Sequence, residues 1–144
     1  MRIVSRPDPV LMSVEEFAIQ LTFEHPDISP DVVTEKIGIE PIHRRLATPG
    51  VGSGQSRGEN HFWRIEHVFE GKRFFFEEVE ELLAVLTEHR AFMAEFNKKG
   101  IVTITIQLSG QVNIGDEAKP DLLYQMAVLG VRLGVEVFPV FQNP

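Results

Sequence analysis

The sequence contains no cysteine. Without thiols the chain forms no disulfide, offers no thiolate nucleophile and holds no thiolate zinc site. A chain of this kind fits a reducing compartment, and we expect a cytoplasmic protein. Disulfide-stabilised and thiol-dependent classes of protein are therefore excluded.

The sequence also lacks a hydrophobic run long enough to cross a membrane. Its longest apolar stretches, residues 102–108 and 126–141, are interrupted by polar residues and fall short of the roughly 20 apolar residues that a membrane helix needs. Residues 1–13 contain no apolar core of signal-peptide length, and Pro7 and Pro9 interrupt them. We expect no membrane span and no secretion signal.

Positive charge is scarce, because 14 Lys and Arg residues against 21 Asp and Glu residues give a formal net charge of -7. Such a field repels phosphate backbones and favours basic partners, so we expect no nucleic-acid ligand. A length of 144 residues, 43% of them hydrophobic, suits one globular domain. We expect a single domain over 1–144, with a loose lead-in over 1–15 and a mobile, glycine-rich loop over 48–59.

Four segments are predicted to be strands, the first three because apolar and polar residues alternate in them. In the first, Phe17, Ile19, Leu21 and Phe23 alternate with polar or small residues. The others are residues 61–69, residues 102–108 and an apolar final segment near 133–140. The first three have a polar second face, which indicates a sheet with one side buried and the other in water.

Three segments between these strands have helix signals. The first begins at Ser29 and Pro30 and ends at Gly38, the second opens with the acidic run 77–81 and ends at Gly100, and the third runs from Pro120 to Gly130. We therefore predict an α+β fold. It is a two-layer α/β sandwich with a mostly antiparallel sheet of four or slightly more strands and helices on one face, for which the ferredoxin-like arrangement is one form.

Short motifs in this order resemble a bacterial family. They are Gly38-Ile39-Glu40-Pro41 after a short helix, a loop with Gly and Arg, Trp63 on the next strand, and Leu122-Leu123 with Ala127, Leu129 and Gly130 before an apolar end. Over roughly residues 17–138 the chain is similar to the domain of unknown function 4279. Ile42 stands where that family more usually has Thr, and residues 136–138 differ from its typical Asp-Ile-Tyr ending. The resemblance implies a bacterial α+β domain and supplies no functional site.

Cationic side chains gather around the glycine-rich loop. They are His43, Arg44 and Arg45 before it, Arg57 within it, and His61 and Arg64 after it. Guanidinium groups bind carboxylate and phosphate in a bidentate way, so these residues form a candidate surface for a ligand or a partner. The loop has neither the P-loop ending nor the glycine spacing of a dinucleotide site, and a solvated connection is the alternative interpretation.

Other chemically suggestive groups have simpler explanations. His61 and His67 lie on one face of a strand but about 20 Å apart, too far for one metal ion. The acidic run 77–81 suits a helix start, and no serine stands in a nucleophile motif. We expect at least two side chains of Phe74–Phe76 to be buried. We predict no catalytic residue, no metal site and no cofactor.

Three hypotheses for function stay open. The leading one is a non-catalytic protein-binding domain, such as an immunity-like protein whose acidic surface covers a basic toxin. The alternative is a small-molecule-binding domain or enzyme that uses the arginine-flanked loop around an anion. The third is homo-oligomerisation, because the edge strands of an open sheet pair readily.

Overall fold

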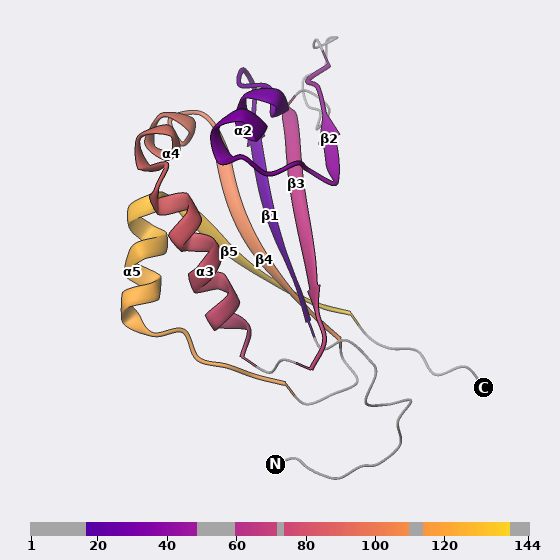
Figure 1. Ribbon diagram of the computed structural model, residues 1–144, viewed down its shortest axis with the longest axis vertical. Coiled ribbons are helices and arrows are strands. Elements are labelled where there is room, and N and C mark those ends of the chain that lie inside the picture. Colours follow the sequence, from indigo (N-terminus) through magenta and orange to yellow (C-terminus); the bar gives the residue numbers. More distant parts are fainter. Residues whose placement is uncertain (1–16, 49–59, 72–73, 110–113, 139–144) are drawn as a thin grey trace, which may run out of the picture.

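The computed structural model describes residues 17–48, 60–71, 74–109 and 114–138 of the chain. Its strands are β1 (Phe17–His25), β2 (His43–Arg45), β3 (His61–Phe69), β4 (Ile101–Ser109) and β5 (Val131–Phe138). Its helices are α2 (Pro30–Ile37), α3 (Phe75–Thr87), α4 (Arg90–Phe96) and α5 (Pro120–Leu129). Figure 1 shows the helices beside the long strands of one sheet. The expected lead-in lies outside the described residues, as does the expected loop apart from Thr48.

The strands form one five-stranded sheet in the order β2-β3-β1-β4-β5. Neighbouring strands are antiparallel except β4 and β5, which are parallel and joined through α5. The predicted α+β class with a mostly antiparallel sheet is confirmed, with five strands rather than four. The chain order β-α-β-β-α-α-β-α-β also extends beyond the β-α-β-β-α-β order of a ferredoxin-like domain.

The sheet has one apolar face, to which all of these helices contribute. Residues at odd positions of β1, such as Leu21, stand in register with Ile65 of β3 and Ile104 of β4. The same buried cluster contains side chains from every described helix: Val33, Ile37, Val79, Leu83, Leu86, Met93, Phe96, Leu122, Met126 and Leu129. Successive strand side chains point to opposite faces, so the even positions of β1 and β3 and the odd positions of β4 make the other face. We call it the open face, although Gln20 and Thr22 of the central strand are buried there.

Helix ends follow the glycine and proline signals of the sequence. Gly38 and Gly130 end α2 and α5 in the left-handed conformation, with φ of 83° and 70°. Pro30 and Pro120 stand at the first positions of the same two helices, where a missing N–H costs no hydrogen bond. Among the described residues, no helix combines the length and the apolar character that crossing a membrane requires.

The single long helix predicted from the acidic run to Gly100 is wrong. The segment forms two helices, α3 and α4, because His89 leaves the helical backbone conformation with φ of -118° and ψ of 38°. The change of direction allows Met93 and Phe96 to enter the core beside the α3 side chains. The expected connection after Pro41 also contains a strand, because β2 pairs with residues 62–64 of β3. The residues of β2, His43–Arg45, are all polar, so no alternation of apolar and polar residues predicts a strand there.

The burial of Phe74–Phe76 agrees in part with the expectation. Phe75 is buried, Phe76 packs half-buried against the core, and Phe74 is 51% exposed. Phe75 makes an edge contact with Phe17 at a centroid distance of 5.8 Å. The core is therefore closed at this end by two of the three rings.

Gly100, just before β4, offers a test of packing at the opposite end of the core. A Cβ there would lie 2.6 Å from the His25 ring, 2.6 Å from the Phe96 ring and 2.7 Å from the Glu24 carbonyl oxygen. We expect Gly100→Ala to lower the free energy of unfolding by about 1–3 kcal/mol, the usual cost of overpacking. Urea denaturation measures the change. Gly115→Ala is the matched control, because a Cβ there meets nothing within 4 Å, and equal stability of the two variants would contradict the packing argument.

Candidate functional site

The register of the sheet divides the predicted cationic residues between its two faces. His43 stands opposite Arg64, and Arg45 stands opposite Phe62, so these four side chains share the open face. Arg44 stands opposite the buried Trp63, on the side of the sheet that carries α2. His61 is at an odd position of β3 and belongs to that side too. Arg57 lies outside the described residues.

Two of the arginines approach one phenylalanine on the open face. The guanidinium carbons of Arg45 and Arg64 lie 5.1 Å and 4.9 Å from the centroid of the Phe62 ring, within cation-π range. Arg64 also donates from Nε to Thr22 Oγ1 at 3.0 Å. We call His43, Arg45, Phe62 and Arg64 the arginine-phenylalanine group. Its guanidinium groups are held near the end of β3 by ring contacts and a hydrogen bond.

The other two cationic residues stabilise the local structure. Arg44 forms an ion pair with Asp31 of α2, with Nη2 and Oδ1 2.8 Å apart. His61 Nδ1 accepts a hydrogen bond from the backbone N–H of Ala47 at 2.9 Å. Both interactions attach the chain around β2 to its neighbours. They account for these two residues without a ligand.

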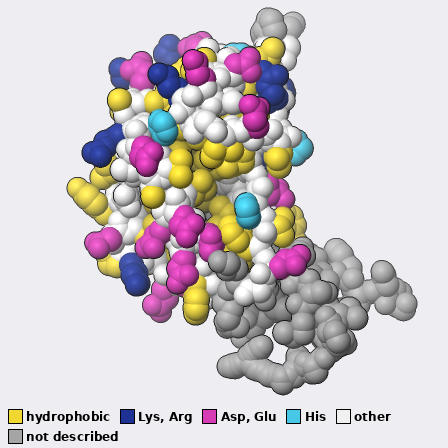
Figure 2. All heavy atoms as spheres, in the orientation of Figure 1, with side chains coloured by type: hydrophobic (Ala, Val, Ile, Leu, Met, Phe, Trp, Pro, Cys, Tyr) yellow, Lys and Arg dark blue, Asp and Glu magenta, His cyan; other side chains and the backbone are white. Residues whose placement is uncertain are grey.

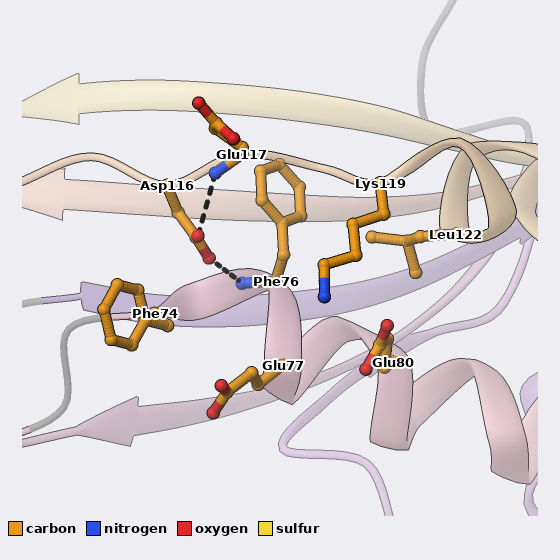
Figure 3. Close-up of a pocket in the computed structure, with 8 residues that line it drawn as sticks. All are labelled: Phe74, Phe76, Glu77, Glu80, Asp116, Glu117, Lys119 and Leu122. Atoms are coloured by element: carbon orange, nitrogen blue, oxygen red, sulfur yellow. Dashed lines mark hydrogen bonds between the residues drawn. The ribbon is translucent and has the colours of Figure 1, made fainter.

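A second candidate site, which the sequence alone did not indicate, is a hollow of about 270 Å³ between α3 and the segment that leads into α5 (Figure 3). In the part of the chain that the structure describes, carboxylates and apolar side chains line it together with one lysine. The lining residues are Phe74, Phe76, Glu77, Glu80, Asp116, Glu117, Lys119 and Leu122. We call it the acidic hollow.

Asp116 holds the two walls of the acidic hollow together. Its Oδ2 accepts the backbone N–H of Phe76 at 2.9 Å, and its Oδ1 accepts the N–H of Glu117 at 2.8 Å. Phe74, the residue before α3, provides no side-chain cap for the helix. Asp116 therefore satisfies one of the free N–H groups at this helix start from a distant part of the chain, and its negative charge suits that end of the helix.

The remaining side chains of the acidic hollow give it the chemistry of a cation-binding surface. Glu77, Glu80 and Glu117 are exposed, and among the described lining residues Lys119 carries the one positive charge. Phe74 and Phe76 add aromatic surface beside the carboxylates. A lysine or arginine side chain has a charged end and an apolar stem, and it can use both kinds of contact.

The described residues contain no constellation for metal binding, since no group of three or more His, Asp or Glu side chains is arranged to hold an ion. The described carboxylates of the acidic hollow form no such group either. His61 and His67 lie on the same face of one nine-residue strand, as the sequence indicated.

Among the described residues, His25, at the end of β1 opposite His61, is a buried titratable group. Its Nδ1 accepts backbone N–H groups of Asp27 and Ile28, both at 2.9 Å, and its ring lies 4.7 Å from that of Phe96. Burial lowers the pKa of His25 below its usual 6.5. Lys99 and His61 lower it further, whereas Asp27 and Glu95 act in the opposite direction.

The lowered pKa of His25 predicts a loss of stability in mild acid. The unfolded chain binds a proton near pH 6.5 while the native imidazole stays neutral, so the stability from neutral His25 is complete above that pH and falls below it. His25→Asn keeps an acceptor near the position of Nδ1 and removes the titration. We expect its free energy of unfolding to fall less than that of the wild type between about pH 7 and about pH 5. Urea titrations at several pH values measure this, and parallel pH profiles would contradict it.

Comparisons with protein-family models, with curated proteins and with solved structures found no match to this chain. The geometry of its two candidate sites is therefore the basis for the functional argument.

Proposed function

We propose that the protein is a non-catalytic binding domain for a basic protein partner, and that the acidic hollow receives a lysine or arginine side chain of that partner. The observation that carries the proposal is the hollow itself, which the exposed carboxylates of Glu77 and Glu80 line together with the exposed ring of Phe74. In the described part of the chain, neither carboxylate makes an ion pair that would occupy it.

The surroundings of the acidic hollow favour the same kind of partner. Figure 2 shows acidic side chains gathered over α3, whereas most Lys and Arg side chains on this face lie toward the end that carries α2 and α4. With a net charge of -7 the whole protein attracts a basic surface, and an acidic region at the contact increases the association rate most. An immunity-like role, in which this surface covers a basic toxin, suits these properties.

Bacterial origin, a cytoplasmic location and membership of the domain-of-unknown-function 4279 family belong to the same proposal. The residues that carry the family resemblance have structural roles in this chain. Gly38 and Gly130 end helices with positive φ, and Trp63 is fully buried with its Nε1 donating to Thr34 Oγ1 at 3.0 Å. They support a shared fold rather than a shared site.

Affinity capture from bacterial lysate tests the binding function. The immobilised wild type should enrich a basic protein, and the variant Glu77→Gln with Glu80→Gln should bind it at least about tenfold more weakly, because both carboxylates lie at the contact. Titration of the purified partner measures the affinities. Asp116 stays unchanged because it caps α3.

The matched control is Glu35→Gln with Glu40→Gln, which removes two exposed carboxylates outside the hollow. It should capture the partner like the wild type. The proposal is overturned if no protein is enriched above an unrelated protein of equal charge, or if the two double variants weaken capture equally.

A second candidate function is the binding of a small anion at the arginine-phenylalanine group, in a binding domain or an enzyme. The observation in its favour is the approach of both Arg45 and Arg64 to Phe62, with His43 opposite Arg64. This arrangement presents two guanidinium groups on one face of the sheet, where an anion can contact both.

Thermal-shift measurements with inorganic phosphate, citrate and ATP test this second function. A bound anion at about 100 times its dissociation constant adds about 2.7 kcal/mol of stability, and Arg45→Ala should abolish that gain while Arg90→Ala, on α4, keeps it. The anion-binding function is contradicted if none of the three anions raises the melting temperature, or if Arg45→Ala leaves the shift unchanged.

A further inference from the structure

The two edges of the sheet differ in how well they resist pairing with another strand. The β2 edge is a strand of three residues, His43–Arg45, all exposed and polar. Short charged strands of this kind prevent edge-to-edge association. The β5 edge has eight residues and carries the exposed side chains of Leu133, Val135, Val137 and Phe138. Long apolar edges associate unless something covers them.

The apolar row of β5 consists of Val131, Leu133, Val135 and Val137, on the side of the sheet that carries the helices. Among the described helices, α5 contacts β5 and covers only the start of this row. α5 has 10 residues and spans about 15 Å, whereas β5 has 8 residues and spans about 26 Å. Exposure on the helix-bearing side accordingly rises from 8% at Val131 through 39% at Leu133 to 61% at Val137. In Figure 1, α5 and β5 diverge from their common end, and β5 runs away from the helix toward the lower right.

We propose that this edge pairs with the β5 edge of a second copy of the chain, antiparallel and about a two-fold axis through Gly134. In this register Val137 stands opposite Val131 of the second copy, and Val135 stands opposite Leu133. The exposed Val137 end of each apolar row then lies beside the Val131 end of the other copy, which the α5 helix of that copy covers. The two sheets become one continuous sheet with both helical layers on the same side.

Charge complementarity selects this register. Arg132 and Glu136 both lie on the open face, opposite Thr103 and Gln107 of β4. About Gly134 each Arg132 faces Glu136 of the other copy, which gives two attractive cross-strand pairs per dimer. A register shifted by two residues separates these charges. A register shifted by one residue turns the apolar row of one copy to the other face of the sheet. Parallel in-register pairing places Arg132 beside Arg132 and Glu136 beside Glu136, so like charges repel.

Two residues of β5, Gly134 and Glu136, favour the proposed pairing about Gly134. Gly134 has no side chain, so the strands approach at the axis without obstruction from that position. Glu136 Oε1 accepts a hydrogen bond from Gln107 Nε2 at 2.9 Å, which holds the carboxylate on the open face.

Charge exchange between the two positions tests the register. Sedimentation velocity of the full chain should show a wild-type dimer, and Arg132→Glu alone or Glu136→Arg alone should each weaken dimerisation about tenfold, because each turns two attractive pairs into two repulsive ones. An equimolar mixture of the two single variants should restore association as a heterodimer, since positions 132 and 136 are then both acidic in one copy and both basic in the other. Circular dichroism establishes that each variant is folded.

Two further variants complete the experiment. Arg90→Glu makes the same charge change on α4 and should dimerise like the wild type, whereas Val135→Lys places a charge in the apolar row and should give a monomer. The proposal is overturned if the wild type is monomeric at about 100 µM, a concentration well above typical dimer dissociation constants, or if mixing the single variants restores no association. Capture of a basic partner at the acidic hollow is measured independently, so either proposal can fail alone.

Discussion

The fold depends on the apolar row of β1, the central strand of the sheet. Phe17, Ile19, Leu21 and Phe23 are almost completely buried and stand between the rows of β3 and β4. The ring of Phe23 contacts both the Trp63 ring, at a centroid distance of 5.2 Å, and the Phe96 ring, at 5.1 Å. Because the row of a single strand is in contact with both the sheet and the helices, a register slip there would expose the centre of the core.

The sequence predicted the parts of the fold that a local periodicity specifies. The alternation of Val102, Ile104 and Ile106 with threonines indicated β4, and its burial alternates as expected. Gly130 and Pro120 marked the ends of α5 correctly. Two features had no local signal. The break at His89 results from the need to bring Phe96 over the end of the core, and β2 forms because β3 offers a free edge.

The candidate site was harder to predict, because it depends on contacts between distant segments. The sequence identified the cationic residues around β2 by type, but only the strand register shows that Arg44 and Arg45 point to opposite faces. The acidic hollow was missed because its walls come from α3 and from the segment around Asp116, 40 residues from Phe76. The available signal was the pair Asp116-Glu117, a second acidic segment that could have been matched to the run 77–81.

The distribution of charge gives each boundary of the sheet a different role. The β2 edge carries three polar side chains, two of them engaged in an ion pair or a ring contact, so it resists another strand. The β5 edge carries one arginine and one glutamate symmetrically about Gly134, beside an apolar row. This symmetric pair of opposite charges favours the antiparallel pairing of an identical strand about Gly134 and opposes parallel in-register pairing, in which like charges would meet. The proposed dimer uses the β5 edge of the sheet, whereas the acidic hollow is lined by α3 and the segment before and into α5. No residue that lines the hollow belongs to β5, so a dimer would present two hollows to a basic partner.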